Sequence, residues 1–130
     1  MADLNAGDSI PELRVTPDKY LPHRYAGASG DFNPIHIDDE LAKAVGLPRN
    51  ILHGLYSMGL VAKANAALAD GNPRALKRLS VQMRGMGVPE QEIVVTGTVK
   101  SADGDRVVID TVAAQGETTL IKNAEAELEL

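Results

Sequence analysis

Alternation of apolar and polar residues dominates the C-terminal half of the chain. Four runs there repeat with a period of two and are rich in Val, Ile and Thr, which is typical of half-buried strands. The runs are 79–84, 93–100, 106–114 and 118–128. Asp103-Gly104 and Gln115-Gly116 separate the last three runs at hairpin spacing. The pattern therefore predicts three strands in an antiparallel meander, preceded by one further strand.

The stretch 53–69 instead contains Leu, Met, Ala, Val and Gly residues over the length of a helix. Its only charge is Lys63, and Asp70-Gly71-Asn72-Pro73 ends it. A helix this apolar is expected to be mostly buried, and its small residues allow a sheet to approach it closely. One buried helix followed by an antiparallel meander predicts an α+β fold in which the sheet curls around the helix.

The N-terminal part of the chain is interrupted by proline and glycine. Residues 9–15 predict a short edge strand, and residues 20–28 predict a helix. In the segment 29–36, a glycine and the Asn33-Pro34 step exclude a continuous helix and predict a shaped loop. A second short helix is expected over 38–46, with an aspartate as its cap and a glycine at its end.

Composition narrows the class of protein. With 130 residues the chain is expected to form a single domain, residues 1–130. A net charge of -5 argues against a nucleic-acid backbone or an anionic membrane as a partner. Cysteine is absent, which excludes disulfides, thiolate nucleophiles and cysteine-ligated metals. No signal-like or membrane-length apolar segment is found, so a cytoplasmic location is expected.

Acid/base chemistry is suggested by one loop. Asp31 and His36 place a carboxylate and an imidazole on either side of a turn that can fold them toward one point. Addition of water to an activated double bond needs one group to take a proton and another to deliver one. Asn33 offers an amide and Ser29 a hydroxyl beside this pair. A developing enolate oxygen needs backbone N–H groups, and Gly54 permits close approach where the buried helix begins.

Two stretches are long and specific enough to compare with known families. Residues 25–36 read YAGASGDFNPIH and residues 53–59 read HGLYSMG, with Ala42, Gly46 and Ile51 between them. This order resembles the MaoC-like, R-specific enoyl hydratase and dehydratase family over residues 25–60. The resemblance implies a hot-dog fold, a homodimer or a heterodimer with a related subunit, and acyl thioesters of coenzyme A or acyl carrier protein as substrates.

The resemblance also implies roles for individual residues. Asp31 and His36 would be the catalytic pair that holds the water and exchanges protons, while the Gly54 amide binds the thioester carbonyl. The implied oxyanion and substrate-binding residues are Gly54, Asn33, Ser29 and Tyr56. The implied product of hydration is the (R)-3-hydroxyacyl thioester, and the implied chemistry needs no metal or redox cofactor.

One segment departs from the family pattern. Where the family often has an aromatic-rich strand followed by a proline-rich turn, residues 81–92 read VQMRGMGVPEQE. An unusual acyl pocket is therefore expected. Met58, Met83 and Met86 either line an acyl tunnel or fill the core, and core filling is the commoner use of methionine.

Simpler interpretations of the same residues exist. Asp31 can cap a turn and His36 can be a structural histidine, although the residues around them favour the catalytic interpretation. A metal site made of His36, His53 and the aspartates at 38 and 39 is disfavoured, because those aspartates occupy a helix-cap position. His53 is expected to have a structural role, holding the loop 29–36 against the start of the buried helix.

Three other functions fit the expected fold. A hot-dog thioesterase would need a carboxylate on or near the central helix, and 53–69 contains none. A non-catalytic subunit of a heterodimeric dehydratase would lack Asp or His, whereas this chain has both and would be the catalytic subunit. A binding module without turnover is left open by the sequence.

Overall fold

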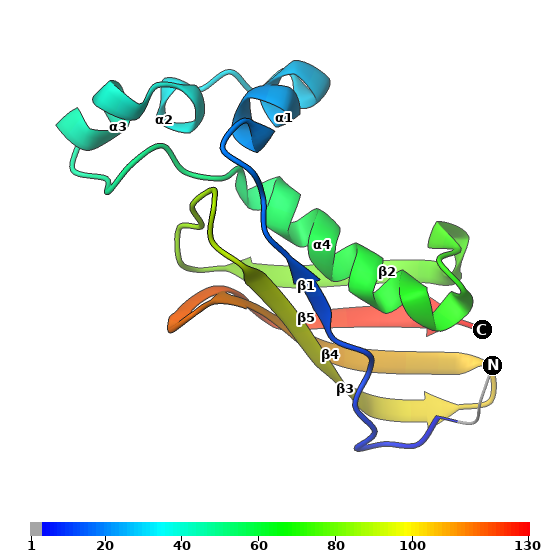
Figure 1. The fold of residues 1–130 in the computed structure, drawn as a ribbon. Coiled ribbons are helices and arrows are strands. Elements are labelled where there is room, and N and C mark those ends of the chain that lie inside the picture. The colour runs from blue at the N-terminus through cyan, green and yellow to red at the C-terminus, as the bar shows by residue number, and fades with distance from the viewer. Residues whose placement is uncertain (1–3) are drawn as a thin grey trace.

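Five strands and four α-helices make up the part of the chain that the structure describes, residues 4–130. The structure is a computed structural model. Its strands form one antiparallel sheet in the order β1-β3-β4-β5-β2, with the long helix α4 lying along one face (Figure 1). The strands are β1 Leu13–Val15, β2 Leu76–Met83, β3 Ile93–Asp103, β4 Arg106–Gln115 and β5 Thr118–Glu129. The helices are α1 Leu21–Ser29, α2 Pro34–Ile37, α3 Asp39–Ala44 and α4 Gly54–Ala66, with 3₁₀ turns at Ala67–Ala69 and Pro73–Ala75.

The three strands predicted as a meander pair in sequence order. β3 pairs with β4 in a register that aligns Val99 with Ile109, and β4 pairs in turn with β5. Gly104 and Gly116 have φ values of 64° and 54° at the two turns, a conformation that glycine adopts without steric cost. The meander is therefore confirmed. The fourth strand predicted in the C-terminal half, β2, pairs with β5 and begins at Leu76 rather than at residue 79.

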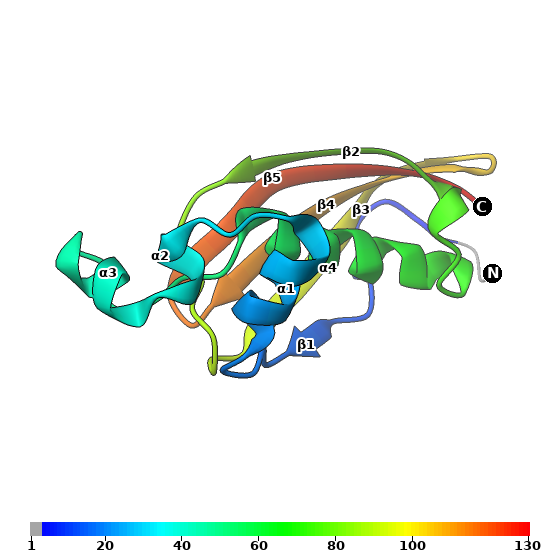
Figure 2. The same cartoon turned by 90° about the horizontal axis from the view of Figure 1, so that it is seen from above.

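The hydrophobic core lies between α4 and the concave face of the sheet, which curves over the helix (Figure 2). Leu60, Val61 and Ala64 are the buried aliphatic residues in the middle of α4. In β4, buried residues such as Ile109 alternate with more exposed ones, because successive side chains of a strand point to opposite faces. The predicted α+β arrangement, with the sheet curled around the apolar helix, is confirmed.

Three short helices form a lobe beyond the N-terminal end of α4 (Figure 1). The prediction of a loop throughout 29–36 is wrong for its second half, where Pro34–Ile37 forms α2. The Asn33 side chain accepts a hydrogen bond from the Ile35 N–H at 3.2 Å, and proline is tolerated in a first helical turn. The Asn-Pro step therefore starts a helix. Asp38, one of the two aspartates predicted as the cap of the following helix, caps α3.

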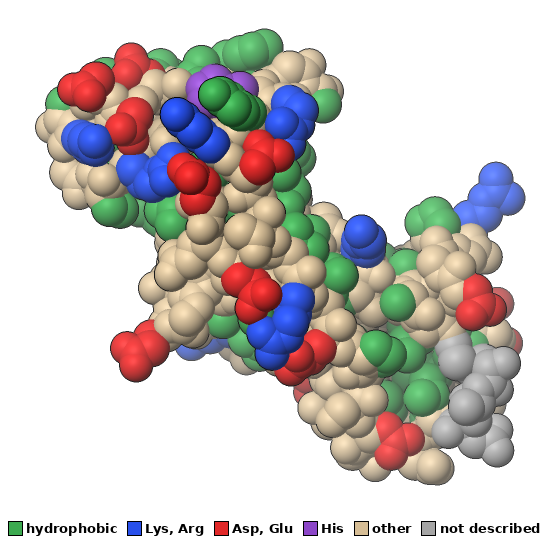
Figure 3. All heavy atoms as spheres, in the orientation of Figure 1, with side chains coloured by type: hydrophobic (Ala, Val, Ile, Leu, Met, Phe, Trp, Pro, Cys, Tyr) green, Lys and Arg blue, Asp and Glu red, His purple; other side chains and the backbone are tan. Residues whose placement is uncertain are grey.

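Charged side chains of both signs are interspersed on the lobe of α1–α3 (Figure 3). Some of them form ion pairs, including Lys43 with Asp39 at 3.0 Å and Arg24 with Asp18 at 2.6 Å. On this face, acidic and basic groups therefore alternate rather than gather into one basic area. Within residues 4–130, no helix has both the length and the apolar character needed to cross a bilayer.

Candidate active site

The loop that carries Asp31 is shaped by hydrogen bonds at the end of α1. Gly30 takes the left-handed conformation, with φ at 79°, and ends the helix. The Ser29 hydroxyl donates to the Tyr25 carbonyl at 2.8 Å and accepts from the Asp31 N–H at 3.2 Å. The Asn33 N–H then donates to Asp31 Oδ1 at 3.2 Å. These contacts hold one carboxylate oxygen of Asp31 in the loop and leave Oδ2 toward His36.

His36 lies on α2 with its ring fixed by the backbone that precedes α4. Its Nδ1 lies 2.8 Å from the carbonyl oxygen of Ile51. A carbonyl oxygen only accepts hydrogen bonds, so Nδ1 must carry the proton, and the neutral ring then has its lone pair on Nε2. Nε2 lies 3.8 Å from Asp31 Oδ2. The imidazole is 10% exposed and the carboxylate 53%, so the pair spans the boundary between the interior and solvent.

His53 connects the start of α4 to the same loop. Its ring stacks on that of His36 with centroids 3.8 Å apart, and the Tyr25 ring lies on it at 4.6 Å. Its Nε2 donates to the carbonyl oxygen of Asp31 at 3.0 Å. The position of Asp31 relative to His36 thus depends on a side chain from the residue just before α4.

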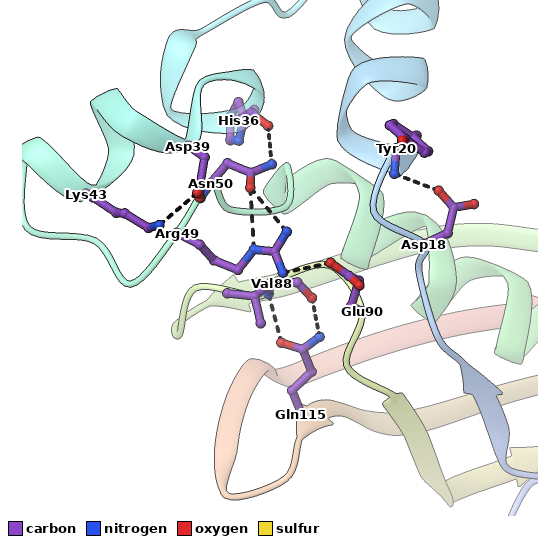
Figure 4. Close-up of polar contacts among 10 residues, drawn as sticks. All are labelled: Asp18, Tyr20, His36, Asp39, Lys43, Arg49, Asn50, Val88, Glu90 and Gln115. Carbon is purple, nitrogen blue, oxygen red and sulfur yellow. Dashed lines mark hydrogen bonds and ion pairs between the residues drawn. The ribbon is translucent and has the colours of Figure 1, made fainter.

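A second set of contacts holds the backbone of His36 (Figure 4). The buried side chain of Asn50 donates from Nδ2 to the His36 carbonyl at 2.9 Å. The backbone N–H of Asn50 donates to Asp39 Oδ1 at 3.0 Å. Arg49 contacts the Asn50 side-chain oxygen and pairs with Glu90 at 3.0 Å. This role of Asn50 was not predicted from the sequence. A polar residue beside the apolar pair at 51–52 was the only local signal.

Asp39 carries a charge that supports this anchor. The pKa of its carboxyl is lowered, chiefly by the hydrogen bond from the Lys43 ammonium and further by the Asn50 N–H. It therefore stays ionised as an acceptor at neutral pH. Asp39 was predicted only as a possible helix cap, and the structure gives the cap to Asp38 instead.

Two cavities meet at the N-terminus of α4. The outer one, of about 290 Å³, is lined in part by Ser29, Asp31, Gly54 and Met83. The inner one, of about 150 Å³, is lined in part by His36 and again by Gly54 and Met83. Because the first amides of a helix have no intrahelical acceptor, the start of α4 offers backbone N–H groups at the junction of the cavities. Asp31, His36, Ser29 and Gly54 are thus brought together.

Asn33 and Tyr56, two other residues expected at the site, line neither of these cavities. The Asn33 side-chain oxygen caps α2, and the Tyr56 ring packs edge-on against Tyr25 at 5.9 Å. Partial burial raises the pKa of the Tyr56 phenol, and the charge of Asp18 adds to the shift. Both residues support the walls of the site in this structure, and their expected contact with substrate stays a prediction.

Comparison with known proteins agrees with this geometry. The model of the MaoC like domain family matches residues 7–121. The chain belongs to the MaoC-like domain family. One relative, the peroxisomal enoyl-CoA hydratase 2 of Arabidopsis thaliana, is 33% identical over 114 residues, which are 87% of this chain and 35% of the relative. The chain therefore spans about a third of that protein.

Solved structures match the whole fold of this MaoC-like chain. A MaoC-like dehydratase superposes with a TM-score of 0.91 at 29% identity and covers 98% of this chain and 41% of the other. The (R)-hydratase from A. caviae involved in PHA biosynthesis superposes with a TM-score of 0.88 at 20% identity, over 100% of this chain and 99% of the other. The hot-dog fold predicted from the sequence is confirmed.

The connection 84–92, which follows β2, is held in part by one buried side chain. Gln115 donates to the Val88 carbonyl at 2.7 Å and accepts from the Val88 N–H at 2.9 Å (Figure 4). It also donates to the Gln91 carbonyl at 2.9 Å. The Leu52 N–H also donates to the Gly87 carbonyl at 2.8 Å. Gln115 was predicted as a turn residue but is the buried last residue of β4. The Gln115 amide thus fixes the backbone of the connection that forms one wall of the inner cavity.

The two histidines and Asp31 also form the group most like a metal site among residues 4–130, with possible ligand atoms within 4.8 Å of one another. Hydrogen bonds to carbonyls already use His36 Nδ1 and His53 Nε2. His53 Nδ1 is buried without a hydrogen-bond partner. Only His36 Nε2 and the Asp31 carboxylate then face the cavities, which are too few ligands for a typical protein zinc site.

We expect the exchange Asn50→Leu to destabilise the protein by about 1–3 kcal/mol, because it leaves the His36 carbonyl buried without its donor. Urea unfolding measures the change. The exchange Gln91→Leu also removes an amide, but from an exposed side chain, and should change stability by less than about 0.5 kcal/mol. Equal stability of the two variants would show that the Asn50 contact does not hold α2 in place.

Proposed function

We propose that this chain catalyses the reversible addition of water to a 2-enoyl thioester, forming the (R)-3-hydroxyacyl thioester. The observation that carries the proposal is the separation of 3.8 Å between His36 Nε2 and Asp31 Oδ2, with Nε2 kept free as a proton acceptor. The similarity to an enoyl-CoA hydratase supports it. The carrier of the acyl group is coenzyme A or acyl carrier protein.

The geometry suggests how water is activated. The distance of 3.8 Å is too long for a direct hydrogen bond, and one water can lie within hydrogen-bonding distance of both atoms. As the water oxygen attacks C3, one member of the pair takes its proton and the pair returns a proton to C2. The hydroxyl thus ends on C3 and the hydrogen on C2. Dehydration follows the same path in reverse.

The start of α4 supplies the third requirement of the reaction. Negative charge develops on the thioester carbonyl oxygen when water attacks, and backbone N–H groups at a helix N-terminus stabilise such charge. Gly54 begins α4 and lines both cavities, so a carbonyl bound at its amide lies beside the Asp31–His36 pair. The Gly54 N–H therefore acts on the carbonyl oxygen while the acid/base pair acts on C2 and C3 of the same substrate.

Hydrolysis of the thioester is a weaker alternative. Such a reaction would use a carboxylate near the central helix to drive water onto the carbonyl carbon. Residues 53–69 contain no Asp or Glu, and the Asp31 carboxylate of the site lies opposite an imidazole. A role as the non-catalytic subunit of a heterodimer fits poorly with the presence of both members of the pair.

The direct test is to add the purified protein to crotonyl coenzyme A and follow the absorbance of the conjugated thioester. We expect the absorbance to fall without release of free thiol, and the product to be the (R)-3-hydroxy isomer. The exchanges Asp31→Asn and His36→Gln should each lower turnover by about 10²–10⁴-fold, which acid/base groups usually contribute.

Two exposed residues outside the site provide matched controls. Asp110→Asn makes the same chemical exchange on the outer face of β4 and should leave turnover unchanged. His23→Gln does so on α1, where the glutamine amide can replace the hydrogen bond of His23 Nε2 to the Ile37 carbonyl at 3.1 Å, and should also leave turnover unchanged. Release of free thiol would instead establish hydrolysis. Near-normal turnover in Asp31→Asn or His36→Gln would remove that residue from the mechanism.

We further propose that residues 1–130 form one hot-dog domain that works as a pair. β2 is an edge strand of eight residues, and an unpaired edge of this length is normally covered. The relative and one solved structure are more than twice as long as this chain, which supports a second copy or a related subunit as its partner. The expected cytoplasmic location stays part of this proposal.

The mass of the isolated chain in solution tests this pairing. Light scattering after size exclusion should give twice the chain mass of 13.8 kDa if a second copy covers the edge. A single-chain mass that persists at high protein concentration would contradict self-pairing. The same mass measurement after addition of a related hot-dog subunit then shows whether a heterodimer forms instead.

A further inference from the structure

The side chain of Met83 stands between the two cavities of the site. It lies at the end of β2, where it pairs with Ile121 of β5. Its sulfur would be only 2.6 Å from a Cβ added to Gly54. Met83 therefore packs directly on the first residue of α4, and together with Gly54 it lines both cavities.

The inner cavity is small and mostly apolar. Leu52, Leu120 and Ile121 form part of its wall, and Gly87 comes from the connection after β2. A Cβ on Gly87 would lie 3.1 Å from the Leu52 side chain and 3.2 Å from the Leu120 side chain. A larger residue at position 87 would therefore reduce the volume of the inner cavity. An apolar cavity of 150 Å³ in another protein holds one benzene molecule, which has six carbon atoms. The volume of about 150 Å³ here therefore suits a short hydrocarbon chain.

The two cavities differ in the reacting groups that they expose. Asp31 lines the outer cavity and His36 lines the inner one. If the thioester carbonyl binds at Gly54 and C3 faces the acid/base pair, the remainder of the acyl chain points into the inner cavity. This orientation leaves the thioester and its carrier on the solvent side.

We propose that Met83 is a specificity-determining residue that restricts this chain to short 2-enoyl thioesters. The inference rests on the proposed hydration. Met83 is 44% exposed and has three rotatable bonds, so it turns aside to admit a short chain and then closes over C2 and C3. A long chain exceeds the 150 Å³ of the inner cavity, extends past the exposed side chain of Met86 and holds the Met83 side chain away from Gly54.

The test compares kcat/KM for four-, six-, eight- and twelve-carbon 2-enoyl coenzyme A substrates. For the wild-type protein we expect kcat/KM to fall by at least about tenfold between the six- and twelve-carbon substrates, since pocket misfit of this kind discriminates by one to two powers of ten. Met83→Ala should recover about tenfold on the twelve-carbon substrate. Gly87→Val should confine activity to the four-carbon substrate.

Val112→Ala is the matched control, because Val112 is 40% exposed on a strand and lines neither cavity of the site. It should keep the wild-type profile. Calorimetric titration with butanoyl and dodecanoyl coenzyme A gives the same ranking without turnover, and circular dichroism shows that each variant is folded.

The outcomes separate this inference from the proposed function. Hydration of crotonyl coenzyme A with a flat chain-length profile, or with a profile that Met83→Ala leaves unchanged, overturns the role of Met83 alone. Binding of butanoyl coenzyme A without hydration of any substrate overturns the proposed function. A folded Met83→Ala variant that gains only the longer substrates supports the inference.

Discussion

The hydrogen bond from His36 Nδ1 to the Ile51 carbonyl is the contact on which the site depends. It determines which nitrogen of the neutral ring holds a proton, and so leaves Nε2 as the acceptor opposite Asp31. It also joins α2 to the segment that leads into α4. The fourteen residues between His36 and Ile51 include α3. Without this hydrogen bond the imidazole could take the other tautomer and present a donor to the cavity.

The short segment 49–54 holds most of the other parts of the site. Asn50 binds the His36 backbone, His53 binds the Asp31 backbone, and Gly54 starts α4. The apolar face of α4 is in turn buried against the sheet, which fixes the direction of the helix N-terminus. Packing of the core therefore determines where the N–H groups, the imidazole and the carboxylate meet. A fold with the same sheet and a displaced segment 49–54 would lose all three relations together.

Much of this arrangement could be predicted from local sequence pattern. The meander follows from period-two alternation, and α4 follows from an apolar run of helix length. Asp31 and His36 stand in a specific order of residues, so they could be selected as a pair before their distance was known. Asn33-Pro34 was interpreted as loop only, because its signals for a turn and for the first turn of a helix are the same.

Residues that act through distant partners could not be predicted in this way. The Asn50 side chain donates to the carbonyl of His36, which is fourteen residues earlier. The Gln115 side chain donates to the carbonyl of Val88, more than twenty residues earlier. Met83 matters because β2 ends beside Gly54, which only the sheet order brings about. Local periodicity contains no information on these contacts. They appear only when the chain is folded.

The tautomer of the neutral His36 ring is the property to measure first. Nitrogen-15 NMR of the histidine-labelled protein, with His36 assigned from the His36→Gln variant, reports which ring nitrogen carries the proton when the ring is neutral. The expected result is a proton on Nδ1 and a lone pair on Nε2. A neutral ring protonated mainly on Nε2 would contradict it, because His36 would then have no acceptor to offer the water beside Asp31.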